Sequence, residues 1–140
     1  MVLADTGYWL ALANRSDRWH EVAVAVTRRL DESLVVTWPV LTETCHLMLS
    51  RLGTLAELRF VEQISTHVDI YEMAKERIDD VRALMERYSN LPMDLADASL
   101  VVAATDLGEG RILTTDQRDF NAYRWKDTEP FTNLLVLSGS

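Results

Sequence analysis

The sequence predicts a single α/β domain over residues 1–140, a three-layer sandwich with a mostly parallel central sheet of four to five strands. Two observations lead to this prediction. Short, strongly apolar segments alternate along the chain with longer segments of helical periodicity. Turn-forming residues separate these segments, and no repeat, low-complexity tract or linker interrupts the series. Alternating strands and helices are typical of a parallel sheet that helices cover on both faces.

The first part of the chain supplies two strands and two helices. Residues 2–4 are apolar and end at an acid, which predicts a short strand, and residues 8–13 follow without a helix breaker. Residues 18–30 carry an apolar stripe at helical spacing, behind a loop with capping side chains. Residues 34–37 are rich in β-branched side chains and precede a proline, so we expect a buried strand there.

The middle of the chain continues the alternation. Residues 40–51 have helical periodicity and stop at Gly53, and residues 55–66 form a further amphipathic segment. Residues 67–71 are the third strand candidate. Residues 73–88 then read as a charged amphipathic helix with one apolar side.

The stretch 91–104 is the one around which the rest of the chain is organised. From Leu95 onward it is apolar on nearly every side, which indicates a helix packed inside a core. It nevertheless carries Asp94 and Asp97, and ionised carboxylates are costly to bury unless a cation or a hydrogen bond meets them. Two interpretations are open at this point: both acids stabilise the start of the helix, or they have a functional role.

Two more strands are expected after this helix. Residues 111–114 are apolar and run directly into an acidic segment that begins at Asp116. A loop with Trp125 and Pro130 separates them from residues 133–137, the last strand candidate. The sheet therefore has four or five strands.

Composition limits the function classes. The chain has 14 basic and 22 acidic residues, a net charge of −8, so its surface as a whole should repel a phosphate backbone. Bound divalent cations over a carboxylate cluster would reverse that sign locally. A single cysteine, Cys45, excludes an internal disulfide and suits a reducing cytoplasm. Neither a signal peptide nor an apolar run long enough to span a membrane is visible, so we expect a cytoplasmic protein without membrane contact.

Acidic residues from distant parts of the chain are expected to meet at one edge of the sheet. Two of them directly follow strands, and two open helices that follow or precede a strand. A helix next to a parallel strand runs antiparallel to it, which places the helix N-terminus at the carboxyl edge, where such sheets bind ligands. The acids of this edge are Asp5, Glu43, Asp97 and Asp116, with Asp94 and Asp119 close by.

Such a cluster favours a metal site over simple helix capping. Capping needs one acid per helix, whereas neighbouring carboxylates repel one another unless cations hold them. Ligands that are all oxygen suit Mg²⁺, with Mn²⁺ as a substitute, and the three scattered histidines form no ligand pair. A carboxylate-held Mg²⁺ pair can activate water for in-line attack on a phosphodiester and stabilise the departing oxygen.

Four segments match the motifs of a known family in order and spacing. They are Asp5-Thr6-Gly7, Leu41-Thr42-Glu43-Thr44-Cys45, Leu95-Ala96-Asp97-Ala98, and Ile112-Leu113-Thr114-Thr115-Asp116 followed by Asp119-Phe120. The chain resembles PIN-domain ribonucleases over essentially its whole length, and most closely the VapC-type toxins of bacterial and archaeal toxin–antitoxin pairs. Each motif alone is weak, but together they are fairly specific.

The resemblance implies a Mg²⁺-dependent endoribonuclease that acts on RNA, forms a homodimer and is inhibited by a cognate antitoxin. Carried over by position, the metal-binding and catalytic set would be Asp5, Glu43, Asp97 and Asp116. Thr6 and Thr114 would orient acids or water through hydrogen bonds. Asp119 competes with Asp116 as the acid of the fourth motif that reaches the metal, and Asp94 is an extra acid without an assigned role.

Two alternatives belong to other functional classes. A phosphoacceptor receiver-like domain also places acids at the carboxyl edge of a parallel sheet. It would need an acidic neighbour for Asp5 and an acid at the end of the third strand, where this chain has Tyr71. A non-catalytic binding module with the PIN fold is the second alternative, and RNA cleavage in the presence of Mg²⁺ separates it from an enzyme.

Overall fold

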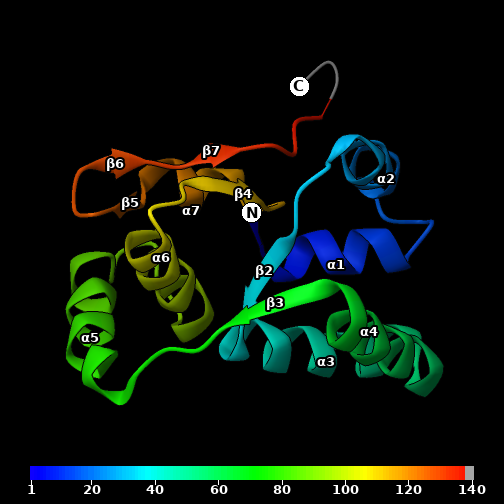
Figure 1. Cartoon of the computed structure of the whole chain (residues 1–140), viewed down its shortest axis with the longest axis horizontal. Coiled ribbons are helices and arrows are strands. Elements are labelled where there is room, and N and C mark those ends of the chain that lie inside the picture. The colour runs from blue at the N-terminus through cyan, green and yellow to red at the C-terminus, as the bar shows by residue number, and fades with distance from the viewer. Residues whose placement is uncertain (138–140) are drawn as a thin grey trace.

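A computed structural model describes residues 1–137 of the protein. The central layer of the molecule is a parallel sheet (Figure 1). The sheet order is β3-β2-β1-β4-β7, and every pairing between these neighbours is parallel. The strands are β1 (Val2–Ala4), β2 (Leu34–Thr37), β3 (Val68–Tyr71), β4 (Arg111–Leu113) and β7 (Thr132–Asn133). The predicted fold class is confirmed, with five strands rather than four.

Helices cover both faces of the sheet. In Figure 1, α5 and α6 lie on one side of the strands and the four N-terminal helices on the other. The helices are α1 (Thr6–Ala13), α2 (His20–Arg29), α3 (Trp38–Leu52), α4 (Thr54–His67), α5 (Ile78–Arg87), α6 (Leu95–Leu107) and α7 (Gln117–Ala122), with a 3₁₀ turn at Lys75–Arg77. The molecule is therefore the expected three-layer sandwich.

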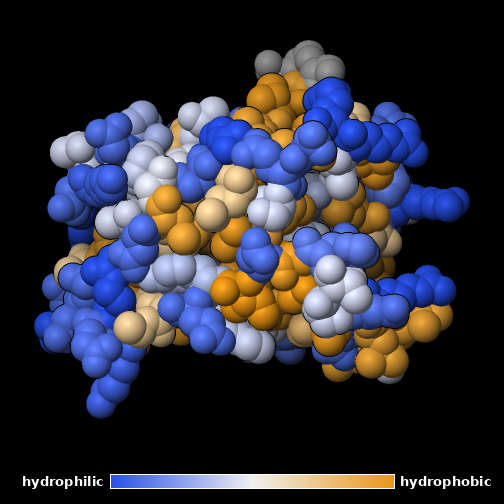
Figure 2. Space-filling view, viewed as in Figure 1, coloured by the Kyte–Doolittle hydropathy of each residue, from blue (hydrophilic) through white to orange (hydrophobic). Residues whose placement is uncertain are grey.

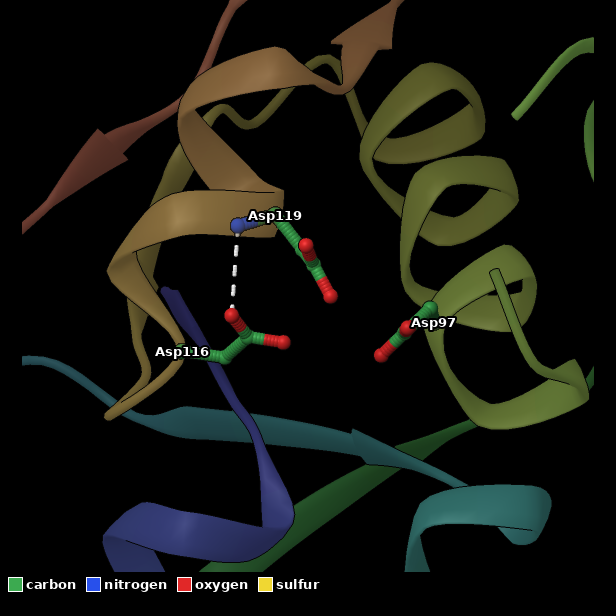
Figure 3. A group of neighbouring side chains, drawn as sticks. All are labelled: Asp97, Asp116 and Asp119. Carbon is green, nitrogen blue, oxygen red and sulfur yellow. Dashed lines mark hydrogen bonds between the residues drawn. The ribbon is translucent and has the colours of Figure 1, made fainter. Parts of the chain in front are cut away.

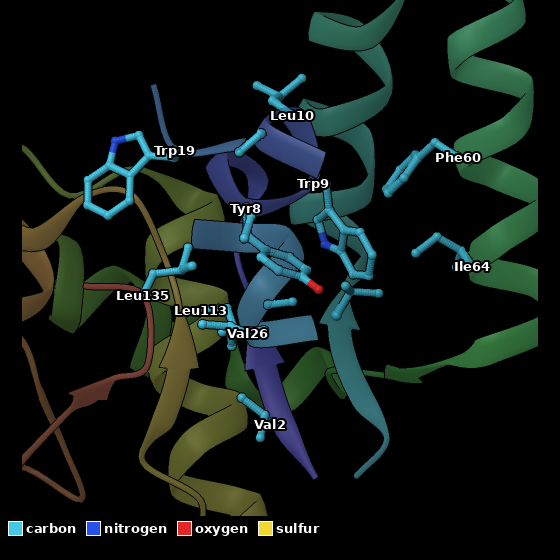
Figure 4. Packing of buried hydrophobic residues seen from close by; sticks show 14 of the residues in the cluster. Val2, Tyr8, Trp9, Leu10, Trp19, Val26, Phe60, Ile64, Leu113 and Leu135 are labelled. Carbon is cyan, nitrogen blue, oxygen red and sulfur yellow. The ribbon is translucent and has the colours of Figure 1, made fainter. Parts of the chain in front are cut away.

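Successive side chains of a strand point to opposite faces of the sheet, which divides the core into two clusters. Leu3 points to the side of α6 and packs with its buried apolar face, whereas Val2 and Ala4 point to the side of α1. On the α1 side, Trp9 is fully enclosed and meets the Phe60 ring edge-on at 5.5 Å (Figure 4). Aromatic contacts of this kind contribute about 0.5–1.5 kcal/mol beyond the burial itself.

Capping side chains fix where the helices of the site begin. The Thr37 hydroxyl accepts the backbone N–H of Val40 at the start of α3, where Pro39 occupies the first turn. The Asp94 carboxylate accepts the N–H of Asp97 at 2.8 Å and so caps α6, as one of the two sequence interpretations predicted. α6 ends at Gly108, whose φ of 66° suits glycine.

The segment after β4 differs from the prediction. We expected a loop, but Asp116 caps the short helix α7, and a hairpin follows from β5 (Arg124–Trp125) and β6 (Glu129–Pro130). Elements of two to six residues are too short to show a periodicity. The hairpin turn places Lys126 and Asp127 at positive φ, a conformation that Asp adopts more readily than most residues but that Lys does not signal.

Several element boundaries also differ from the prediction by a few residues. The last strand is Thr132–Asn133 rather than 133–137, because the Asn133 side chain accepts the Leu135 N–H at 3.1 Å in place of a strand partner. The helix predicted from residue 73 becomes α-helical only at Ile78, after the 3₁₀ turn. The helix predicted from residue 18 begins at His20.

The surface has an apolar region over α3 and α4. Figure 2 shows orange side chains gathered there, in contrast to the predominantly hydrophilic surface over α5. Trp38 is 54% exposed, and Leu55 and Leu58 are each 60% exposed. None of the helices in residues 1–137 is both long and apolar enough to cross a membrane.

Candidate active site

The predicted acids lie at the carboxyl edge of the sheet, as the strand directions require. Asp5 follows β1 and is the N-cap of α1, and Asp116 stands at the N-terminus of α7 beyond the end of β4. Asp97 lies in the first turn of α6, and Asp119 in the first turn of α7. Helix N-termini attract negative charge, so the ends of α6 and α7 favour carboxylates at this edge.

Three carboxylates from two helices converge on one point. Asp97, Asp116 and Asp119 each offer an oxygen, and these oxygens lie within 4.8 Å of one another. Figure 3 shows Asp97 facing the two acids of α7 across a gap between the helices. The Asp119 N–H donates to Asp116 Oδ1 at 3.2 Å, which keeps these two side chains together. We call this trio the acid cluster.

Asp5 borders the acid cluster, but hydrogen bonds occupy its carboxylate. Oδ1 accepts the Thr6 backbone N–H and Oδ2 accepts the Thr114 hydroxyl, each at 2.8 Å. The residue is 7% exposed, and burial raises the pKa of its carboxyl to about 6, with Glu43 and Asp116 adding repulsion. Asp5 is therefore held rigidly beside the cluster by the Thr6 backbone N–H and the Thr114 hydroxyl.

Glu43 and Asp94 form the outer part of the same edge. α3 starts two residues earlier than expected, so Glu43 lies in the second turn of that helix rather than the first. Partial burial raises the pKa of Glu43, and the nearby charge of Asp94 raises it further. Neither residue belongs to the trio of close carboxylates in the described chain. The structure thus brings Asp119 into the cluster and places Glu43 at its margin.

Asp97 is the most strongly perturbed acid of the site. Burial, together with the negative charges of Asp94 and Asp5, raises the pKa of its carboxyl to about 8. The Tyr123 hydroxyl donates to Asp97 Oδ2 at 2.9 Å and opposes this rise. At neutral pH, an ionised Asp97 in this cluster therefore requires a nearby positive charge.

Residues that sequence reasoning did not identify hold the acids in place. Tyr123 is fully buried at the end of α7 and contacts Asp97, yet nothing in the sequence near it signals a hydroxyl aimed at an acid. The Asn133 side chain, on β7, forms two hydrogen bonds with the backbone of Thr114. Its Nδ2 donates to the Thr114 carbonyl at 2.9 Å, and its Oδ1 accepts the Thr114 N–H at 3.2 Å. Thr114 also accepts the Asp116 N–H at 3.0 Å.

A close approach at Gly7 keeps the edge compact. A Cβ at this position would lie 1.9 Å from Thr115 Oγ1 and 3.1 Å from Thr115 Cβ. Only glycine therefore allows the first turn of α1 to pack against the segment that leads to Asp116. This explains physically why Gly follows Asp5-Thr6.

The donor set fits a hard divalent cation. Every ligand atom of the acid cluster is a carboxylate oxygen, and the group found in residues 1–137 contains no histidine or cysteine. The cationic side chain paired with the cluster is Arg118, whose Nε lies 3.2 Å from Asp119 Oδ1 and which is 77% exposed. One exposed guanidinium does not neutralise three acids, so Mg²⁺ or Mn²⁺ matches both the charge and the ligand type.

Comparison with known proteins agrees with the fold and the position of the acids. The model of the PIN domain family matches residues 2–126, which include every acid described above. The chain belongs to the PIN domain family. This membership excludes the receiver-like alternative.

Within this family, the PIN domain described here is similar to VapC-type toxins. It is 28% identical over 127 residues to Ribonuclease VapC26 of Mycobacterium tuberculosis, covering 88% of this chain and 92% of that protein. VapC20 of the same organism, a toxin that cleaves the sarcin–ricin loop, superposes with a TM-score of 0.77 at 20% identity, over 84% of this chain and 92% of its own. FitAcB from Neisseria gonorrhoeae gives a TM-score of 0.62 at 16% identity, over 94% and 97% of the two chains. At these identities the two structures support the fold alone.

Proposed function

We propose that this PIN domain is a Mg²⁺-dependent endoribonuclease and the toxin of a toxin–antitoxin pair in the cytoplasm. The observation that carries the proposal is the convergence of Asp97, Asp116 and Asp119 within 4.8 Å at the carboxyl edge. Similarity to Ribonuclease VapC26 supports RNA as the substrate. Mn²⁺ has the same preference for oxygen ligands and would substitute.

The chain's own residues would prepare the site for hydrolysis. Asp97, Asp116 and Asp119 would hold the cation, with Asp5 and Glu43 beside them. When bound, Mg²⁺ lowers the pKa of a water molecule and stabilises the negative oxygen that leaves phosphorus. The Tyr123 hydroxyl holds Asp97 in one orientation. The Thr114 hydroxyl, just after β4, donates to Asp5 and accepts the Asp116 N–H. It therefore links these two acids.

The partners of the protein follow from the same resemblance. We propose a cognate antitoxin that blocks the site, and a homodimer. The exposed apolar side chains over α3 and α4, among them Trp38 and Leu55, support association with a protein surface. Co-expression with the product of a neighbouring short gene would test the antitoxin, and light scattering after size exclusion would test the homodimer.

Cleavage of an end-labelled RNA pool tests the proposed activity. The wild-type chain is expected to cut RNA with Mg²⁺ and not with EDTA, and Asp97→Asn is expected to abolish cutting. Asp79→Asn, an 87% exposed acid on α5, is the matched control and should cut as the wild type does. Attack by water leaves no 2′,3′-cyclic phosphate, so the product ends identify the nucleophile. A folded Asp97→Asn protein that cuts at the wild-type rate would refute the site, and an inert wild type would favour the binding module.

A further inference from the structure

A basic cavity lies between α5, α6 and the hairpin turn, on a chain that is acidic overall. It has a volume of about 220 Å³, and its charged lining comprises four cationic side chains and two acidic ones. Its floor includes the apolar residues Leu84 and Val101. The charged residues are Arg77, Arg87, Arg124, Lys126, Asp80 and Asp127. On a protein of net charge −8, this local excess of positive charge requires an explanation.

Internal ion pairs account for only part of this positive charge. Arg77 is neutralised by Asp80 at 2.6 Å and Asp106 at 2.9 Å, which fixes α5 to α6. Arg87 donates to the Asp127 carbonyl at 3.2 Å and lies 3.7 Å from the Asp127 carboxylate. These two arginines therefore have structural partners.

Arg124 and Lys126 have no carboxylate partner within residues 1–137. Arg124 uses Nη1 to donate to carbonyls at the end of α7, the shortest of these bonds being 2.7 Å to Asn121. Its Nη2 and Nε make no hydrogen bond within the described chain. Lys126 lies over the Trp125 ring, 5.6 Å from its centroid, and its side chain is exposed. Both cations remain available to an anion.

The cavity lies farther toward the C-terminal end of α6 than the acid cluster, and Val101 and Tyr123, on the side that they share, are buried. Asp97, Val101 and Thr105 are spaced four residues apart, so they share one face of α6, and Val101 and Thr105 line the cavity. The segment from Tyr123 to Lys126 runs along the same face. Its first residue donates to Asp97, and the Lys126 N–H donates to Thr105 Oγ1 at 3.0 Å. Asp97 and Thr105 are about 12 Å apart along the helix axis.

We propose that this cavity binds a backbone phosphate of the RNA strand, farther along the strand than the phosphate that is cut. The inference rests on the proposed function, and it adds a second point of contact for the substrate. A guanidinium and an ammonium match a phosphate in charge and in hydrogen bonding. A strand with one phosphate at the acid cluster would bring a later phosphate, about 12 Å or more away, to Arg124 and Lys126. An acidic protein segment would gain from the charge but has no reason to lie beside the acid cluster.

The test measures binding of a fluorescein-labelled single-stranded RNA by anisotropy in EDTA, over a range of salt concentrations. Arg124→Gln/Lys126→Gln is expected to weaken binding roughly tenfold at low salt, because hydrogen bonds to a charged group are lost. The slope of log affinity against log salt should fall by about 0.7, the value for one phosphate contact on a single strand. Arg124→Lys/Lys126→Arg keeps both charges and should retain the wild-type slope.

The matched control is Lys75→Gln/Arg82→Gln, which removes the same charge from exposed positions outside the cavity. Its slope should equal that of the wild type. A glutamine double variant that binds RNA like this control would overturn the inference. The inference would also be overturned if binding of a labelled poly-glutamate peptide depended on Arg124 and Lys126 while binding of RNA did not.

A separate cleavage assay with Mg²⁺ keeps the two proposals distinguishable. If the wild type cuts RNA but the RNA affinity does not depend on Arg124 and Lys126, this inference is overturned and the proposed nuclease activity stands. A wild type that does not cut RNA, but whose RNA affinity depends on Arg124 and Lys126, overturns the nuclease and supports the cavity. Thermal unfolding of each variant confirms that the compared chains are folded.

Discussion

Replacing Asp97 by Asn should stabilise the metal-free protein at alkaline pH while removing its response to Mg²⁺. The pKa of Asp97 rises from its ordinary value of 3.8 to about 8 in the folded chain. Because the pKa of Asp97 is lower in the unfolded chain, its carboxyl ionises there at a lower pH than in the folded chain. Between these two pKa values the unfolded state therefore binds fewer protons than the folded state. The free energy of unfolding therefore decreases as the pH rises from about 4 to 8.

The size of the effect follows from the shift. At about 1.4 kcal/mol per pH unit, the upper limit above pH 8 is roughly 6 kcal/mol. Partial solvent access to Asp97 and the loss of a favourable charge in the first turn of α6 reduce this to roughly 2 kcal/mol. For a chain of 140 residues, that corresponds to a rise in Tm of about 6 °C. Asn retains an oxygen that accepts from Tyr123, so packing should be preserved.

Urea unfolding in EDTA, near pH 4 and above pH 8, measures the effect. From pH 4 to above pH 8, the free energy of unfolding should fall more for the wild type than for Asp97→Asn. Above pH 8 the variant should therefore be the more stable chain. Saturating Mg²⁺ should then stabilise the wild type and not the variant, because the ion binds only the folded state. Identical pH profiles for the two chains, or a variant that is less stable above pH 8, would refute the electrostatic reasoning.

Three other substitutions test separate parts of the site. Tyr123→Phe removes the donor to Asp97 and should weaken Mg²⁺ binding about tenfold by calorimetry, with a near-normal Tm. Thr114→Val should cost about 1–3 kcal/mol in urea unfolding because it leaves Asp5 Oδ2 and the Asp116 N–H unpartnered, whereas Thr114→Ser should not. Gly7→Ala should cost about 1–3 kcal/mol in the same measurement because its Cβ collides with Thr115, and unchanged stability would contradict this packing.

The sequence was sufficient to predict the layers and the edge at which the acids meet. Strand direction follows from the alternation of strands with helices, and direction alone places Asp5 and Asp116 on the same side as the start of α6. In the 91–104 stretch, helix capping does not exclude the proposed functional role. Asp94 caps α6, and the same first turn presents Asp97 to the acid cluster.

The supporting contacts could not be predicted in the same way. α7 escaped prediction because six residues show no periodicity, so the sequence could not show that Asp116 and Asp119 both join the cluster, nor where Tyr123 lies. The contact between Asn133 and Thr114 depends on the pairing of β7 with β4, which no local pattern specifies. Such long-range hydrogen bonds are set by the assembled sheet rather than by sequence near either partner.

The pairing of β1 with β4 determines when during synthesis the centre can exist. The hydrogen bond between Asp5 and Thr114 joins positions 109 residues apart, and β1 has β4 as one of its two neighbours in the sheet. A ribosome makes the N-terminal strand long before the other half of this pair has been translated. The nascent polypeptide consequently carries separate acids that do not yet face one another, and the centre is assembled only after β4 and the acids that follow it have been translated.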